Sequence, residues 1–120
     1  MSAKNLEKRD LKMYVLVNEN IQIGKGRLAG QVGHAVNVYV WENRDSDKVH
    51  EYMSGSIKKI ILFAPQITLE QLEFENYTAI REDGIVNLES NVLTCVNIGI
   101  LDYASFPNYL EWIRSLELVY

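Results

Sequence analysis

Short runs of β-favouring residues alternate with segments of helical periodicity, and this alternation restricts the fold more than any other feature of the chain. The β-favouring runs lie at residues 13–17, 57–64, 77–81 and 92–98. Helical patterns occupy residues 27–41 and 45–53, and others begin at Thr68 and near Pro107. Strands separated by helices are typical of an α/β fold. We therefore expect an α/β domain with a mixed, mostly parallel four-stranded sheet, helices on both faces, and residues 118–120 closing the sheet edge.

The local signals also place several boundaries of these elements. Pro65 cannot continue a central strand, so we expect the second strand to stop there. Gly55 is placed to end the second helix. Thr68-Leu69-Glu70-Gln71 matches the capping-box pattern, which predicts a helix that starts at Thr68. Asp83-Gly84 predicts a turn after the third strand.

The length and composition favour one intracellular domain. The 120 residues fit a charged N-terminal tail at residues 1–11 and a single domain at residues 12–120. The tail lacks the apolar core of a signal peptide, and no apolar run approaches the ~20 residues of a membrane span. Cys95 is the only cysteine, which excludes an intrachain disulfide and suits a reducing compartment. We expect a cytoplasmic protein that does not enter the membrane.

The charge is divided unevenly between the two halves of the chain. Residues 1–60 contain ten Lys/Arg against seven Asp/Glu, whereas residues 61–120 contain two against nine. The net charge is −4. Because phosphate neutralisation supplies much of the affinity for nucleic acid, this distribution argues against strong tRNA binding, and any basic footprint is at most a local one in the first half.

The junction between a loop and the first helix carries the strongest local signal. Gly24 and Gly26 have no side chains, so the backbone around Lys25 is accessible, and Arg27 adds a second cation at the expected helix start. Exposed amides at a helix N-terminus attract anions, so this segment could bind a phosphate or an oxyanion. The spacing matches neither the P-loop nor the dinucleotide fingerprint. The alternative is that the glycines only turn the chain and the cations are solvated.

Two stripes run along this first helix. Leu28, Val32, Ala35 and Tyr39 recur at helical spacing and predict the face that packs on the sheet. Arg27, Gln31 and His34 form a polar stripe, on which His34 could be a general base, bind a ribose hydroxyl or hold a loop. Gly30 and Gly33 each cost the helix roughly 1 kcal/mol relative to alanine, which suggests that something packs closely against them. His50 lies in another segment, so no metal site is expected.

Arg81-Glu82-Asp83-Gly84 lies at the end of a predicted strand, where open α/β sheets place their ligands. Glu82 and Asp83 could act as a base and a charge partner, with Lys25 as an electrostatic stabiliser. The alternative is a polar turn without a functional role.

Taken together, these segments resemble the class II peptidyl-tRNA hydrolases. The signature M-G-K-G-K-x-A-A-Q-x-x-H-A of that family is similar to Ile23-Gly24-Lys25-Gly26-Arg27-Leu28-Ala29-Gly30-Gln31-Val32-Gly33-His34-Ala35. Its later motifs resemble Gly55-x-x-Lys58-Lys59-Ile60-Ile61-Leu62, Ile80-Arg81-Glu82-Asp83-Gly84 and Thr94-Cys95-Val96-Asn97-Ile98-Gly99. The matches occur in order over residues 13–120.

The resemblance implies a four-stranded mixed sheet and, commonly, a homodimer. The implied reaction is hydrolysis of the ester that joins a peptide to the 3′ ribose of tRNA, and it needs no cofactor or metal. Lys25 matches the essential lysine of the family. Gln31 and His34 match its helix-face residues, and Glu82 or Asp83 its acid. By this resemblance the expected catalytic residues are Lys25, His34 and Glu82 or Asp83. The expected substrate-binding residues are Gly24, Gly26, Arg27, Gln31, Arg81 and Asn20.

The chain departs from the family pattern after that acid. Ile85 and Val86 stand where the family has an arginine and a threonine, and Asn20 stands where it has an aspartate. Two main hypotheses therefore remain open. The chain is either an active peptidyl-tRNA hydrolase, or a binding or regulatory protein that keeps the fold without the chemistry. A weaker hypothesis is another small ester or nucleotide as the ligand of the same cleft.

Overall fold

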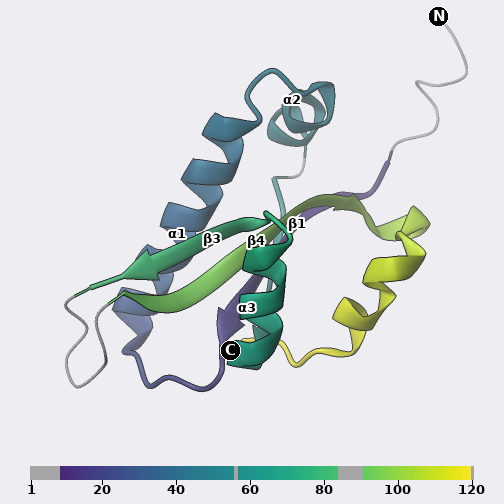
Figure 1. The fold of residues 1–120 in the computed structure, drawn as a ribbon. Coiled ribbons are helices and arrows are strands. Elements are labelled where there is room, and N and C mark those ends of the chain that lie inside the picture. The colour runs from purple at the N-terminus through teal and green to yellow at the C-terminus, as the bar shows by residue number, and fades with distance from the viewer. Residues whose placement is uncertain (1–8, 56, 84–90, 120) are drawn as a thin grey trace, which may run out of the picture.

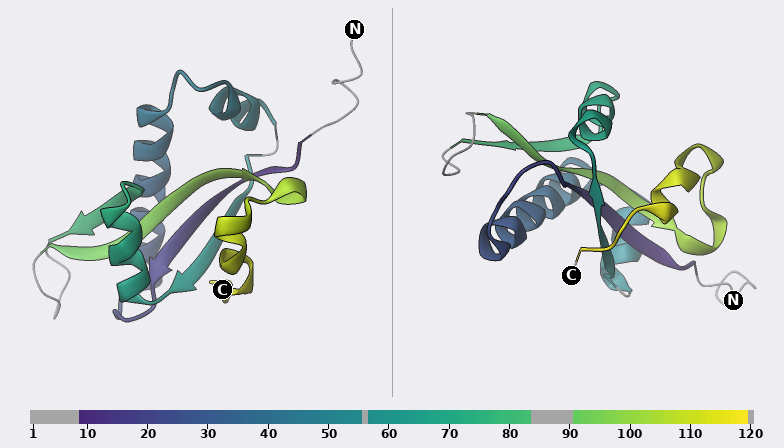
Figure 2. Two further views of the ribbon diagram at one scale, coloured as in Figure 1. Left: turned by 45° about the vertical axis from the view of Figure 1, so that its right-hand side comes forward. Right: turned by 90° about the horizontal axis from the view of Figure 1, so that it is seen from below.

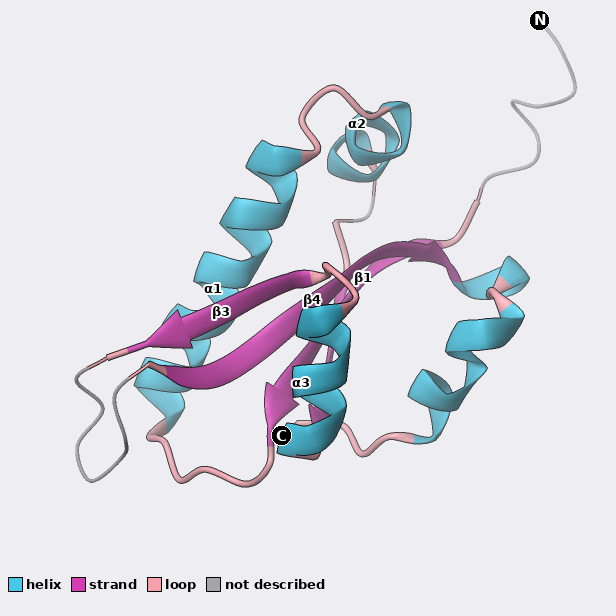
Figure 3. Cartoon of the chain, viewed as in Figure 1, coloured by secondary structure: helices cyan, strands magenta, loops and turns pink. Residues whose placement is uncertain are grey.

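A four-stranded sheet forms the centre of the structure, a computed structural model that describes residues 9–55, 57–83 and 91–119. Its strands are β1 (Leu11–Asn18), β2 (Lys59–Ala64), β3 (Thr78–Glu82) and β4 (Val92–Asp102), in the spatial order β2-β1-β4-β3. Figure 1 and Figure 3 show β4 between β1 and β3. All four lie at or near the positions that the sequence predicts.

The sheet is mixed, but the prediction that it is mostly parallel is wrong. β1 and β2 are parallel, whereas β4 runs antiparallel to both β1 and β3. A parallel pair needs a crossover of a dozen or more residues, usually with a helix. Two helices provide this crossover between β1 and β2, whereas only residues 83–91 separate β3 from β4.

Helices cover both faces of the sheet, as expected (Figure 2). Met13, Val15 and Val17 of β1 are buried in one apolar cluster with residues of α1 (Lys25–Glu42) and α2 (Asp47–Ser54). Tyr14 and Leu16 point to the other face, where α3 (Gln66–Phe74) and the 3-10 helix η3 (Asn108–Ser115) pack. A second 3-10 helix, η2 (Tyr103–Ser105), follows β4. The alternation along β1 therefore separates two cores, one on each side of the sheet.

The apolar stripe of α1 packs on the sheet as the sequence predicts. Ala35 is fully buried, and Leu28, Val32 and Tyr39 pack against the same cluster. Further on, Gly55 is the C-cap of α2, in agreement with the predicted end of that helix.

The predicted start of α3 at Thr68 is wrong. The helix begins at Gln66, with Pro65 as its N-cap, so Thr68 lies inside the first turn. Pro65 has the extended backbone that is typical of an N-cap residue, with φ −64° and ψ 150°. The cap comes instead from a distant segment, because the Oδ1 atom of Asn20 accepts a hydrogen bond from Gln66 N at 2.7 Å.

The C-terminal segment covers the edge of β2. Leu118 forms an antiparallel bridge with Leu62, and Val119 N donates to Ile61 O at 3.0 Å. The expected closure of the sheet edge is therefore confirmed for these residues. The last helix, η3, is a 3-10 helix.

Several expectations concern residues outside the described ones: residues 1–8 of the tail, the glycine of the Asp83-Gly84 turn, Ile85 and Val86, and Tyr120. Leu11, placed in the tail by the sequence, is the first residue of β1. In the described part of the chain, no helix is both long and apolar enough to span a bilayer.

Candidate active site

The carboxyl ends of β1, β2 and β3 meet at one edge of the sheet. This follows from the pairing, because β2 is parallel to β1 and β4 is antiparallel to both β1 and β3. Figure 1 shows the first turn of α1 beside the end of the β3–β4 pair. Open α/β sheets bind ligands at such an edge. The predicted site residues lie at or near it, on α1, at the end of β3 and in the loop after β1.

Gln31 joins three distant segments at this edge. Its side chain is buried, with 8% of the residue exposed. The amide Nε2 donates to Glu82 Oε2 at 3.1 Å, and the amide Oε1 accepts from Thr94 Oγ1 at 3.1 Å. Since one end of the amide holds the carboxylate and the other the hydroxyl, its orientation is set on both sides. The Glu82 carboxylate is therefore held beside α1.

Thr94 is a site residue that the sequence reasoning did not single out. It is fully buried in β4, and its hydroxyl also lies 3.1 Å from Ile80 O. The only signal was its place at the start of the Thr94–Gly99 motif, where it reads as an ordinary strand residue.

Glu82 and Asp83 take different positions. Glu82 is partly buried and bonds to Gln31. Asp83 is exposed, and its Oδ1 accepts a hydrogen bond from Asn91 N, which ties the end of β3 to the start of β4. Of the two acids that the sequence left as alternatives, only Glu82 contacts the polar stripe of α1 in the described structure.

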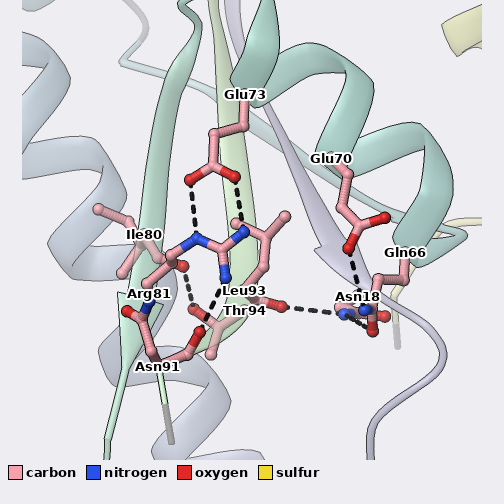
Figure 4. Close-up of polar contacts among 9 residues, drawn as sticks. All are labelled: Asn18, Gln66, Glu70, Glu73, Ile80, Arg81, Asn91, Leu93 and Thr94. Carbon is pink, nitrogen blue, oxygen red and sulfur yellow. Dashed lines mark hydrogen bonds and ion pairs between the residues drawn. The ribbon is translucent and has the colours of Figure 1, made fainter.

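Arg81 points toward Glu73 on α3 (Figure 4), which packs on the face of the sheet opposite α1 and its Gln31. Its Nε and Nη2 atoms bind the carboxylate of Glu73 on α3 at 2.8 and 2.7 Å, and its Nη1 donates to Asn91 O at 2.8 Å. The hydrogen bond from Arg81 holds the pKa of Glu73 below its usual value and raises that of Arg81. The structure therefore does not bring Arg81 together with the other predicted site residues.

Asn20 and Asn18 fix the loop that follows β1. Asn18 is 4% exposed, and its amide donates to Leu93 O at 2.9 Å and to Gln66 Oε1 at 3.3 Å (Figure 4). Its Oδ1 accepts from Asn20 N at 2.8 Å. With the cap that Asn20 provides for α3, this network connects the ends of β1 and β2. The sequence did not reveal the role of Asn18, since the pattern shows only a polar residue ending a strand.

The first turn of α1 presents positive charge at the positive end of the helix dipole. Gly24 is the N-cap and provides no side-chain cap, and the first turn contains no acidic residue. Lys25, Gly26 and Arg27 are exposed. Each cation at a helix N-terminus is unfavourable by about 0.3–1 kcal/mol, which a bound anion would reverse. The local chemistry therefore suits an anionic ligand.

The small residues of α1 leave its outer face open. A Cβ atom built at Gly30 or Gly33 would meet no atom within 4 Å. No described part of the chain therefore packs closely on these glycines, and the space is open to a ligand. His34, exposed and one turn after Gln31, lies on the same helix.

Cys95, next to Thr94, is unsuited to act as a nucleophile. The thiol is fully buried, and burial raises its pKa to about 11, so the reactive thiolate is not formed near neutral pH. Among the described residues, no three His, Cys, Asp or Glu side chains cluster as a metal site requires.

Comparison of the sequence with known proteins identifies the family of this chain. The family model described as peptidyl-tRNA hydrolase PTH2 matches residues 11–104. The peptidyl-tRNA hydrolase of Methanothermobacter thermautotrophicus is 27% identical over 99 residues, covering 74% of this chain and 85% of the relative. That of Haloquadratum walsbyi is 30% identical over 96 residues, with the same coverage. That of Saccharolobus islandicus is 28% identical over 102 residues, again with the same coverage. The match spans both the Gly24–His34 segment and the Gln31–Glu82–Thr94 contacts, and the chain belongs to the peptidyl-tRNA hydrolase PTH2 family.

Proposed function

We propose that this protein hydrolyses the ester bond between peptide and tRNA in peptidyl-tRNA, which releases the peptide and free tRNA. One observation carries the proposal beyond family membership. Gln31 holds the Glu82 carboxylate on a sheet edge beside the cationic first turn of α1. An ester hydrolase needs a base for water and positive charge for the developing oxyanion, and this edge offers both.

In the proposed reaction Glu82 accepts a proton from a water molecule as the water oxygen attacks the ester carbonyl. The carbonyl oxygen becomes negative in the tetrahedral intermediate, and the Lys25 ammonium stabilises it. The intermediate then collapses, the bond to the ribose oxygen breaks, and the proton on Glu82 passes to that oxygen. Gln31, oriented by Thr94, keeps the carboxylate in place throughout.

The substrate-binding surface in this proposal is the open side of α1. Gly24, Gly26 and Arg27 contact phosphate at the 3′ end of the tRNA, where the first-turn amides favour an anion. Gln31 and His34 lie on the adjacent stripe and are suited to orient the terminal ribose. Asn20 and Arg81 do not contact the substrate in this proposal. Asn20 supports the loop before α1 through its hydrogen bond from Gln66 N, and Arg81 supports the start of β4 through its hydrogen bond to Asn91 O.

The direct test is release of tRNA from diacetyl-lysyl-tRNA. Wild-type protein should turn over this substrate. Lys25→Ala should lower kcat/KM by about 100- to 1,000-fold, the usual effect of removing one oxyanion donor. Lys58→Ala, which removes an exposed lysine at the opposite end of the sheet, is the matched control and should retain wild-type activity. An intact substrate after incubation with the wild type, under conditions in which a known peptidyl-tRNA hydrolase cleaves it, would support the binding-protein alternative instead.

We also propose that the protein acts in the cytoplasm, where peptidyl-tRNA arises, and that it forms a homodimer. The exposed apolar side chains of Trp41 and Met53, on α1 and α2, support a second copy on that side of the molecule. Sedimentation should show a dimer at micromolar concentration, and a purely monomeric species would contradict the dimer.

A further inference from the structure

An open groove lies between α3 and η3. Both helices lie on the face of the sheet opposite α1 (Figure 2). The volume of the groove is about 670 Å³, and its apolar lining comes from both helices and the segment that follows α3: Ile67, Leu72, Tyr77, Tyr109, Leu110 and Trp112. None of the residues in the proposed reaction lines it. The groove is therefore a feature separate from the hydrolytic site.

Two of the apolar side chains that line the groove are largely exposed to solvent. Ile67 is 76% exposed and Tyr109 is 73% exposed, while Leu72 and Leu110 form a buried floor. The indole N–H of Trp112 donates to Tyr109 O, which holds the ring at the groove wall. A contiguous exposed apolar surface with aromatic walls is typical of a protein-binding site.

The charge around the groove indicates which class of partner it can bind. Glu75, the C-cap of α3, lines it, and Glu70 lies on α3; neither forms an ion pair with another described residue. Residues 61–120 contain only two Lys/Arg, and both are engaged: Arg81 with Glu73, and Arg114 with Glu111 and with the rings of Tyr103 and Phe106. The groove is therefore apolar at its centre and negative at its rim. Nucleic acid does not suit such a surface, because phosphates would meet uncompensated carboxylates.

We propose that this groove binds a short, basic, amphipathic helix of a partner protein. The nine residues of α3 extend over about 13 Å, so a bound helix of two to three turns would follow the groove. Apolar side chains at i, i+3 or i+4, and i+7 enter between Tyr109 and Ile67, and flanking Lys or Arg meets Glu75. A second copy fits less well, because two such grooves face to face would oppose their own carboxylates.

The probe is a 14-residue peptide of Leu and Lys, with Leu on one helical face and Lys on the other. Its control replaces every Lys with Glu. Binding is measured by calorimetry with the full chain, and amide shifts of the same samples locate the contact. We expect the Leu/Lys peptide to bind with an affinity that falls as salt rises, and to shift amides of α3 and η3. The Leu/Glu peptide should not bind.

Variants test whether the groove is responsible. Tyr109→Ala and Glu75→Lys should each weaken binding of the Leu/Lys peptide about tenfold. Trp41→Ala removes an exposed aromatic from α1, and Asp45→Lys makes the same charge change outside the groove; both should bind as wild type does. Lys25→Ala should also bind normally, which separates this proposal from the hydrolase.

The inference would be overturned by equal binding of the Leu/Glu peptide, by unchanged binding in both groove variants with native-like amide spectra, or by amide shifts confined to α1. Loss of a dimer in Tyr109→Ala would likewise overturn it and assign the groove to a second copy of the chain.

Discussion

Replacing Thr94 with valine tests the bridge that holds Glu82. The Thr94 hydroxyl is fully buried and lies 3.1 Å from Gln31 Oε1. Valine has nearly the same shape, so Thr94→Val opens no cavity but leaves the buried Gln31 oxygen without this donor. An unpaired buried acceptor costs about 1–3 kcal/mol. For a domain of this size, a loss of about 2 kcal/mol lowers the melting temperature by roughly 8 °C.

The same change should reduce catalysis. Without Thr94 the Gln31 amide is no longer held at both ends, so its N–H no longer fixes the Glu82 carboxylate. A misplacement of about 1 Å in a reacting group costs up to about 100-fold in rate. We expect kcat on diacetyl-lysyl-tRNA to fall by about 10- to 100-fold. KM should change little, because the first turn of α1 is untouched.

Thr78→Val is the matched control. The Thr78 hydroxyl donates to Glu42 at 3.2 Å on the surface, so its loss should change the free energy of unfolding by less than about 0.5 kcal/mol. Calorimetric melting and single-turnover kinetics of both variants test whether Thr94 positions the Glu82 carboxylate through Gln31. If Thr94→Val melts and reacts as Thr78→Val does, the bridge from Thr94 through Gln31 does not position the carboxylate.

Three further predictions follow from other contacts. The double change Gly30→Ala and Gly33→Ala should raise the free energy of unfolding in urea by about 1–2 kcal/mol, because alanine favours the helix and no atom obstructs the new methyl groups. If substrate packs against these positions, KM should rise in the same variant. An unchanged KM would mean that substrate does not approach them. In the proposed complex Arg27 is the cation of the first turn that contacts phosphate, so a plot of log KM against log salt should have a slope of about 0.7, and a slope several times larger would contradict a single phosphate contact. The hydrogen bond and ion pair with Arg81 hold the pKa of Glu73 below its unfolded value. The free energy of unfolding of wild type should therefore exceed that of Glu73→Gln by up to about 1 kcal/mol above pH ~5, and this difference should be lost as pH falls through the lowered pKa. A difference that does not shrink as the solution is acidified would contradict this origin.

The elements that depend on local patterns could be read from the sequence. The stripe that contains Leu28, Val32 and Ala35 identifies the buried face of α1, and β-favouring runs locate all four strands. The glycines around Lys25 likewise mark the helix start. These features follow from side-chain periodicity and backbone freedom within a few residues.

The parts that depend on distant contacts could not be read in this way. The direction of β4 follows from its pairing with β1, which no local pattern contains. The true cap of α3 comes from Asn20, far along the chain, so the local Thr68 signal was misleading. Alternation along β3 places Arg81 and Glu82 on opposite faces, but which of them meets α1 depends on how the sheet packs.

The most direct test of the proposed site compares Glu82→Gln with Asp83→Asn in the hydrolysis of diacetyl-lysyl-tRNA. Both changes remove one negative charge at nearly constant shape, on neighbouring residues of the same strand end. Glu82 contacts Gln31, whereas Asp83 binds only the Asn91 backbone among the described residues. We predict that kcat falls by at least about 100-fold in Glu82→Gln and less than about fivefold in Asp83→Asn. The reverse order, or equal activity in both variants, would contradict the site described for this protein.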